Sequence, residues 1–149
     1  LVSRLAELDR GFLASRDSAE ARAETRQTGA ALLRWLATVL PQSTERAIGD
    51  RVRAENGELT APVAFGLCAH AQGLPAAAAC FAWGFAWLEN QVQAAVKIVP
   101  LGQTSGQRLL IRLRGQALEP VATRAWSFSP LAAVMSMRHE RQYSRLFRS

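Results

Sequence analysis

The chain has 149 residues, of which 49% are apolar, and its 18 lysines and arginines against 12 acidic residues give a formal net charge of +6. This length predicts one domain with its own hydrophobic core, and the apolar content excludes disorder of the whole chain. The positive charge by itself does not indicate nucleic-acid binding. The arginines are spread along the sequence, and no zinc-finger spacing, RNP pattern or other DNA-binding motif accompanies them.

The first half of the chain repeats apolar residues at helical spacing. Residues 1–15 carry leucines three or four positions apart, which predicts an amphipathic helix. Asp17 and Glu20 have capping-box spacing, so a second helix is predicted to begin there and to end at Leu40, before Pro41. Thr44 is the expected cap of a third helix that reaches about residue 55.

Proline and glycine mark the helix boundaries in the second half. Residues 59–72 are predicted to form a helix that stops at Gly73, and Ser129 and Pro130 are predicted to begin the last helix. The most hydrophobic stretch begins a helix over about 75–99. Because its apolar part is shorter than the ~20 residues of a membrane span, we expect it to be buried inside the protein.

Three further elements complete the prediction. They are a loop over residues 102–106, a helix through Gly115 that is capped by Thr104 or Ser105, and a short helix over 118–126. No segment shows the alternation typical of a strand. We therefore predict an all-α protein: one domain over residues 1–149, arranged as a multi-helix bundle around the hydrophobic 75–99 helix.

Catalytic and metal-binding patterns are weak. Cys68 and Cys80 lie in apolar helical segments and are expected to be buried, reduced thiols. Cys68 and His70 are two positions apart, so on a helix their side chains point apart rather than toward one metal ion. The glycine-containing segment 102–108 lacks the spacing of a phosphate-binding loop. We predict no enzymatic activity and no metal site within one chain.

Two surfaces remain open to more than one interpretation. Glu89, Gln93 and Lys97 are four residues apart and form a polar stripe, which is either a solvent-exposed face or a contact surface. On a helix, the C-terminal segment separates arginines from apolar residues, and it either docks on a partner or packs on its own core. The arginines are Arg138, Arg141, Arg145 and Arg148, and the apolar residues are Met135, Tyr143, Leu146 and Phe147.

The same C-terminal segment carries a family resemblance. Its string RHERQYSRLFRS, residues 138–149, is similar to the C-terminal signature of the urease accessory protein UreF family. Residues 96–108 (VKIVPLGQTSGQR) and 62–66 (PVAFG) resemble two further elements of that family, and residues 22–29 resemble it more loosely. The family's serine- and glycine-rich opening motif is absent, so we expect this chain to be a fragment without its N-terminal part.

The resemblance implies a non-enzymatic accessory protein for nickel insertion into apo-urease. Such proteins pair with UreD (also called UreH), recruit the GTPase UreG, form homodimers and act in the cytoplasm, with nickel handled by the assembled complex and no tightly bound cofactor. A direct regulator of GTP hydrolysis by UreG, which inserts an arginine or lysine in trans, is the alternative. A basic helical nucleic-acid binder is a weaker one.

The resemblance also implies which residues meet a partner. Lys97 belongs to the block at 96–108, and the others belong to the C-terminal signature. The expected partner-binding residues are Lys97, Arg138, His139, Glu140, Gln142, Tyr143, Ser144, Arg145, Leu146 and Phe147. For His139, we also expect a hydrogen bond that orders the C-terminal segment.

Overall fold

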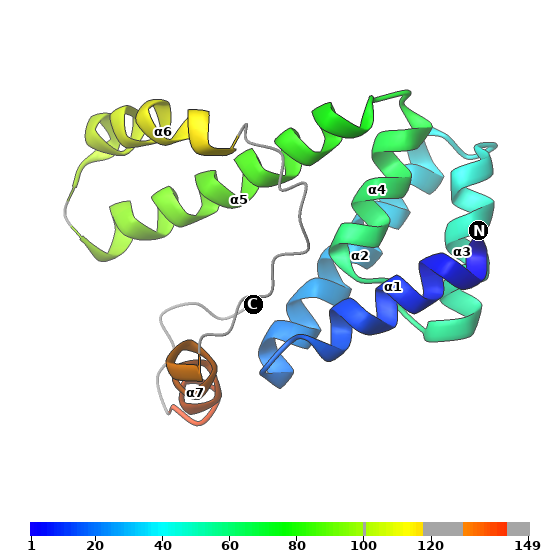
Figure 1. The fold of residues 1–149 in the computed structure, drawn as a ribbon, viewed down its shortest axis with the longest axis horizontal. Helices are drawn as coiled ribbons and strands as arrows, with labels where there is room; N and C mark the ends of the chain where they lie inside the picture. The colour runs from blue at the N-terminus through cyan, green and yellow to red at the C-terminus, as the bar shows by residue number, and fades with distance from the viewer. Residues whose placement is uncertain (100, 118–129, 143–149) are drawn as a thin grey trace. The chain divides into compact units, whose positions relative to one another are not determined.

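The computed structural model describes residues 1–99, 101–117 and 130–142. These residues form seven α-helices and no strand, which confirms the all-α prediction (Figure 1). The helices are α1 (Val2–Ala14), α2 (Ala19–Val39), α3 (Thr44–Asn56), α4 (Ala61–Ala71), α5 (Ala76–Ile98), α6 (Gln103–Ala117) and α7 (Pro130–His139). The predicted short helix over 118–126 lies outside the described residues.

The chain divides into two compact units. The first contains Leu1–Gly73 together with Ser127–Ser149, and the second contains Leu74–Trp126. The first unit therefore combines α1 to α4 with α7, from opposite ends of the sequence, whereas the second contains α5 and α6. The single domain expected from chain length stays a prediction.

The hydrophobic core of the first unit is built by α1 to α4. Its buried members are Val2, Ala6, Leu36, Val52, Leu59, Ala64, Leu67 and Cys68. Helices α2 and α4 pack together, and α3 packs against both α1 and α4. At Gly29 of α2 the approach is so close that an added Cβ would lie 2.0 Å from the carbonyl oxygen of Leu59. Only glycine fits this point, because any other residue would meet the backbone beside α4.

Helix boundaries follow the sequence signals with small shifts. The N-cap of α2 is Ser18 rather than Asp17, because Ser18 accepts a hydrogen bond from the Ala21 N–H. Similarly, Ser43 rather than Thr44 caps α3. Gly73 has the predicted left-handed conformation, with φ of 71°. Each misplaced cap lies one residue from the true one, where two residue types able to cap a helix are adjacent in the sequence.

A buried polar cluster connects α1 and α2 to the start of α4. The carboxylate of Asp9 accepts hydrogen bonds from the Thr60 N–H at 2.8 Å and from the Thr60 hydroxyl at 2.7 Å. The Asn56 amide donates a third bond to Asp9, and Thr25 accepts from the Ala61 N–H at 3.0 Å. Helix α4 therefore begins with backbone donors satisfied by side chains from α1 and α2.

The second unit pairs α5 with α6. The long helix predicted over about 75–99 is present as α5, and the burial expected for it is limited within its own unit. Val92 is its one buried residue, Trp87 is 62% exposed, and Cys80, expected to be buried, is exposed. Its apolar residues extend around more of the helix than α6 covers, so the described core lies in α1 to α4 instead.

The expected loop over 102–106 is also wrong, because α6 already begins at Gln103. Gly102 makes the turn with φ of 69°. Gly106 lies inside the helix, where an added Cβ would come 2.6 Å from Cγ2 of Val96 on α5. This glycine allows close packing of the two helices rather than loop flexibility. Across the described ranges, none of the helices combines the length and apolar character needed to cross a membrane.

Candidate partner-binding site at the C-terminal segment

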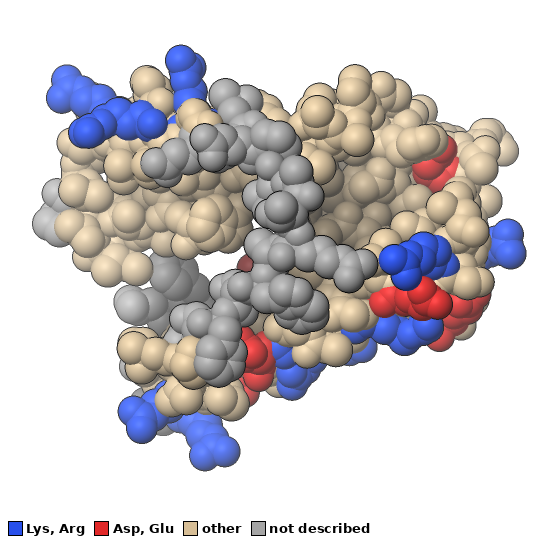
Figure 2. All heavy atoms as spheres, in the orientation of Figure 1, with Lys and Arg blue, Asp and Glu red and all other residues tan. Residues whose placement is uncertain are grey.

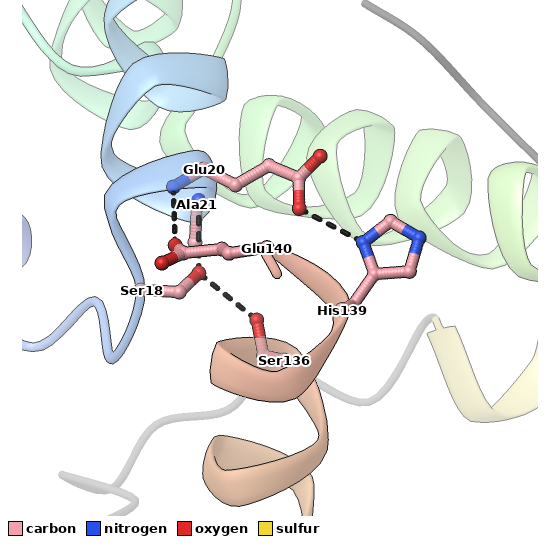
Figure 3. A network of polar contacts seen from close by, with 6 residues as sticks. All are labelled: Ser18, Glu20, Ala21, Ser136, His139 and Glu140. Atoms are coloured by element: carbon pink, nitrogen blue, oxygen red, sulfur yellow. Dashed lines mark hydrogen bonds and ion pairs between the residues drawn. The ribbon is translucent and has the colours of Figure 1, made fainter. Parts of the chain in front are cut away.

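Helix α7 and the residue after it contact the first turn of α2 (Figure 3). Ser136 donates a hydrogen bond from its hydroxyl to Oγ of Ser18 at 2.9 Å. The carboxylate of Glu140 accepts a bond from the Glu20 N–H at 2.8 Å. The two α7-side residues are four apart, so they lie on one helical face and reach the same end of α2.

An ion pair lies beside these hydrogen bonds. Nδ1 of His139 is 3.0 Å from a carboxylate oxygen of Glu20 (Figure 3). This contact is a salt bridge when the imidazole is protonated. The sequence analysis expects His139 to make a hydrogen bond that orders the C-terminal segment, and the structure shows a contact of His139 with Glu20 on α2. His139 and Glu140, both expected to bind a partner, are therefore engaged within their own unit.

The position of Glu140 explains why the pKa of its carboxyl is lowered. The Glu20 N–H holds the pKa of the Glu140 carboxyl below its ordinary value, with help from the backbone of Ala19, the Ser18 hydroxyl and the charge of Arg22. Partial burial acts in the opposite direction. An anion at a helix N-terminus is stabilised because the first N–H groups have no partner within the helix and carry partial positive charge. Glu140 is such an anion for α2.

The opposite face of α7 is exposed. Leu131, Val134 and Met135 are 70%, 41% and 62% exposed, and Arg138 is exposed one turn further along the same face. Arg141 and Gln142 are exposed after the helix. The helix ends at His139, so Arg138 lies within it and Arg141 follows it, while Arg145 and Arg148 of the predicted arginine stripe lie outside the described residues.

The remaining predicted site residues belong to the second unit or lie outside the described residues. Lys97 is exposed near the end of α5 in the second unit, on the same polar stripe as exposed Glu89 and half-buried Gln93. The residues outside the described part are Tyr143, Ser144, Arg145, Leu146 and Phe147.

The side chains of Cys68 and His70 contact different helices, as their spacing predicts. The Cys68 thiol is buried and lies 3.5 Å from the carbonyl oxygen of Leu32 on α2, and burial raises the pKa of this thiol. His70 is exposed, and its Nδ1 lies 2.7 Å from the Glu45 carboxylate on α3. Within the described ranges, no group of three or more His, Cys, Asp or Glu side chains is placed to hold a metal ion.

The sequence interpretation missed two features. Glu20 was considered only as part of a local capping pattern with Asp17, Ser18 was not considered, and no local signal indicated an acceptor 120 residues away. Helix α6 also presents exposed Arg108, Arg112 and Arg114, and basic side chains project from this part of the surface in Figure 2. The spacing of Arg108 and Arg112, one helical turn apart, is a signal that could have found them.

The structure thus defines an all-helical protein whose C-terminal helix is docked by one face and exposes an apolar and basic face on the other side. Comparison with known proteins identifies the protein family of this chain. The UreF family model matches residues 2–114, and the chain belongs to the UreF family.

Two similar relatives each have the name urease accessory protein UreF. The protein of Azoarcus sp. (strain BH72) is 45% identical over 157 aligned residues, which cover 97% of this chain and 64% of the relative. The protein of Paracidovorax citrulli (strain AAC00-1) is 41% identical over 155 residues, covering 99% of this chain and 61% of the relative. The chain thus spans less than two thirds of the length of these relatives.

Proposed function

We propose that this chain acts in urease maturation as an accessory protein, as a scaffold rather than as an enzyme. Its partners are UreD (UreH), the GTPase UreG and apo-urease. The observation that supports this most is membership of the UreF family, together with the relatives' names. Because those relatives are longer, the proposal concerns the whole protein to which this chain corresponds.

The surface proposed to bind UreD is the exposed face of α7 with the residues that follow it. Leu131, Val134 and Met135 offer apolar area, and Arg138 and Arg141 offer charge. Guanidinium groups form paired hydrogen bonds with carboxylates, and arginine is enriched among the residues that dominate interface energies. This combination fits a partner groove that is apolar at its centre and acidic at its rim.

Nickel is proposed to be handled by the assembled complex, with no tightly bound cofactor in this chain. The separate engagement of Cys68 with α2 and of His70 with α3 supports this. The proposal also includes a homodimer in the cytoplasm, which the family resemblance implies. Light scattering of the complete protein, alone and with UreD, measures the oligomeric state, and a monomer at high micromolar concentration would contradict the dimer.

Co-purification of the protein with UreD tests the proposed scaffold function. The double variant Arg138→Ala/Arg141→Ala is expected to lose or strongly weaken co-purification with UreD, because both arginines are exposed beside the apolar face of α7. Arg51→Ala is the matched control, since Arg51 is an exposed arginine on α3. Unchanged co-purification of the double variant would remove these arginines from the proposed interface.

A second candidate function is direct stimulation of GTP hydrolysis by UreG. The exposure of Arg138 on α7 and of Lys97 on α5 favours it, because a cation inserted in trans must be accessible. Single substitutions of these residues separate the two functions when assembly and hydrolysis are both measured. A variant that still assembles but no longer stimulates hydrolysis indicates a trans-acting cation, whereas loss of assembly indicates the scaffold.

A further inference from the structure

Helix α2 receives part of its N-terminal cap from the other end of the chain. Its own N-cap, Ser18, accepts from the Ala21 N–H at 3.1 Å, and the first backbone bond within the helix runs from the Arg22 N–H to the Ser18 carbonyl. The Glu20 N–H instead donates to Glu140 at 2.8 Å. The carboxylate of Glu140 thus satisfies a first-turn donor that α2 cannot satisfy itself.

Neighbouring contacts give this cap a defined geometry. The Glu140 N–H donates to the Ser136 carbonyl at 3.2 Å, so Glu140 stays one helical turn beyond Ser136. The Ser136 hydroxyl reaches Ser18, and His139 reaches Glu20, from the same side of α7. We name Ser18, Glu20, Ser136, His139 and Glu140 the α7 latch (Figure 3).

The α7 latch decides which face of α7 is available. With Ser136 and Glu140 against α2, the exposed face is the one that carries Leu131, Met135 and Arg138. A helix held in one orientation loses less conformational freedom when a partner binds than a free helix does.

We propose that Glu140 is a positioning residue: by capping α2 it holds α7 in the orientation that presents its apolar and basic face to a partner protein. This inference rests on the proposed function, because it assumes that the partner binds that face. Two other roles are possible for the same carboxylate. It either contacts the partner directly or makes a docking contact with no effect on partner binding, and the experiments below separate these roles.

The first experiment measures the α7 latch without any partner. In the complete protein, Glu140→Ala is expected to speed hydrogen exchange of the Glu20 amide several-fold, measured by NMR, since that N–H loses its acceptor. Glu140→Gln, which keeps an acceptor oxygen, is expected to retain part of the protection. Glu55→Ala is the charge-matched control, as Glu55 is exposed on α3. Unchanged exchange in Glu140→Ala would overturn the capping role.

The second experiment replaces the cap by a covalent tether. The Oγ atoms of Ser18 and Ser136 are 2.9 Å apart, so cysteines at both positions are placed to form a disulfide between α2 and α7. Exposed Cys80 is first changed to serine to prevent mispairing. Affinity for UreD is then measured for the oxidised and reduced forms of Ser18→Cys/Ser136→Cys, each with Glu140 and with Glu140→Ala.

Positioning predicts that Glu140→Ala weakens binding several-fold in the reduced form and that oxidation restores the affinity. If the oxidised Glu140→Ala protein still binds weakly, Glu140 contacts the partner itself and the inference is wrong. Equal affinity of the two reduced forms would also overturn it. It is also informative if no form binds UreD although the Glu20 amide exchanges as expected. The capping contact of the α7 latch is then supported, but the proposed function is wrong. The positioning role of Glu140 for this partner is then wrong as well.

Discussion

At the scale of single residues, Asp9 is the buried charge on which the start of α4 depends. Its carboxylate accepts bonds from the Thr60 N–H, the Thr60 hydroxyl and the Asn56 amide. Asp9→Ala leaves the two buried donors of Thr60 unsatisfied, and we expect it to lower the free energy of unfolding by about 3 kcal/mol. Urea denaturation of the variant and the parent protein measures the difference.

Asp50→Ala is the control for this prediction. Asp50 is exposed and lies 3.7 Å from Arg46 in a surface ion pair, so its loss is expected to change the stability by less than about 0.5 kcal/mol. Equal effects of the two substitutions would show that burial and hydrogen bonding of Asp9 do not contribute as we infer.

The two cysteines make a second prediction at this scale. Cys80 is exposed, whereas Cys68 is buried and burial raises the pKa of its thiol. Because the thiolate is the reactive form, a maleimide or a disulfide reagent is expected to modify Cys80 much faster than Cys68 in the native protein. Peptide mapping by mass spectrometry identifies the modified residue. Rapid modification of Cys68 before unfolding would contradict the packing of α4 on α2.

At the scale of helices, two glycines that both lie inside helices have opposite roles. An added Cβ at Gly29 would lie 2.0 Å from the Leu59 carbonyl oxygen, whereas at Gly11 of α1 nothing lies within 4 Å. Gly29→Ala is expected to destabilise the protein by about 2 kcal/mol or more, because α2 and α4 must separate. Gly11→Ala is expected to stabilise it by about 0.5 kcal/mol through helix propensity. Thermal denaturation measures both, and equal melting temperatures would exclude the close approach.

Docking of α7 on α2 is expected to depend on pH. The Glu20 N–H holds the pKa of Glu140 below its ordinary value of 4.5, so the ionised carboxylate favours the docked state. The resulting stabilisation is complete above the pKa of the undocked carboxyl and is lost as the pH falls through the lower pKa of the docked one. The Glu20 amide resonance is therefore expected to stay constant down to about pH 5 and to shift at lower pH.

Other charged groups near Glu140 require a control for this titration. The charge of Arg22 acts on the Glu140 carboxylate, and Glu20 and His139 contact each other beside it. The titration is therefore repeated with Glu140→Gln, which lacks the ionisable group. A transition below pH 4.5 that persists in this variant belongs to the neighbouring residues and would contradict the role assigned to Glu140.

At the scale of the whole molecule, we expect the C-terminal segment to be separable from the hydrophobic core. In the described part of the chain, the buried members of the core cluster belong to α1–α4 or to the segment just before α4. Truncation after Met135 is expected to leave cooperative unfolding and helical content nearly unchanged while abolishing co-purification with UreD. Circular dichroism and co-purification measure the two effects. If the truncated protein unfolds, the segment is part of the core and not a binding element.

Local residue patterns predict the elements well and their burial poorly. Apolar repeats predicted α1, a continuous hydrophobic stretch predicted α5, and Gly73 predicted the end of α4, because these signals act within a few residues. The exposure of Cys80 and Trp87 could not be predicted in this way. An apolar residue on a helix is buried only where another element covers its face.

The sequence by itself determined the all-helical class and the UreF resemblance, since both depend on residue types and their spacing along the chain. It also drew attention to His139 and Glu140 through the C-terminal signature. Only the tertiary structure decided what these two residues do. Their partners on α2 lie about 120 positions earlier in the chain, and a contact over that separation forms only when the folded first unit brings both ends of the chain together.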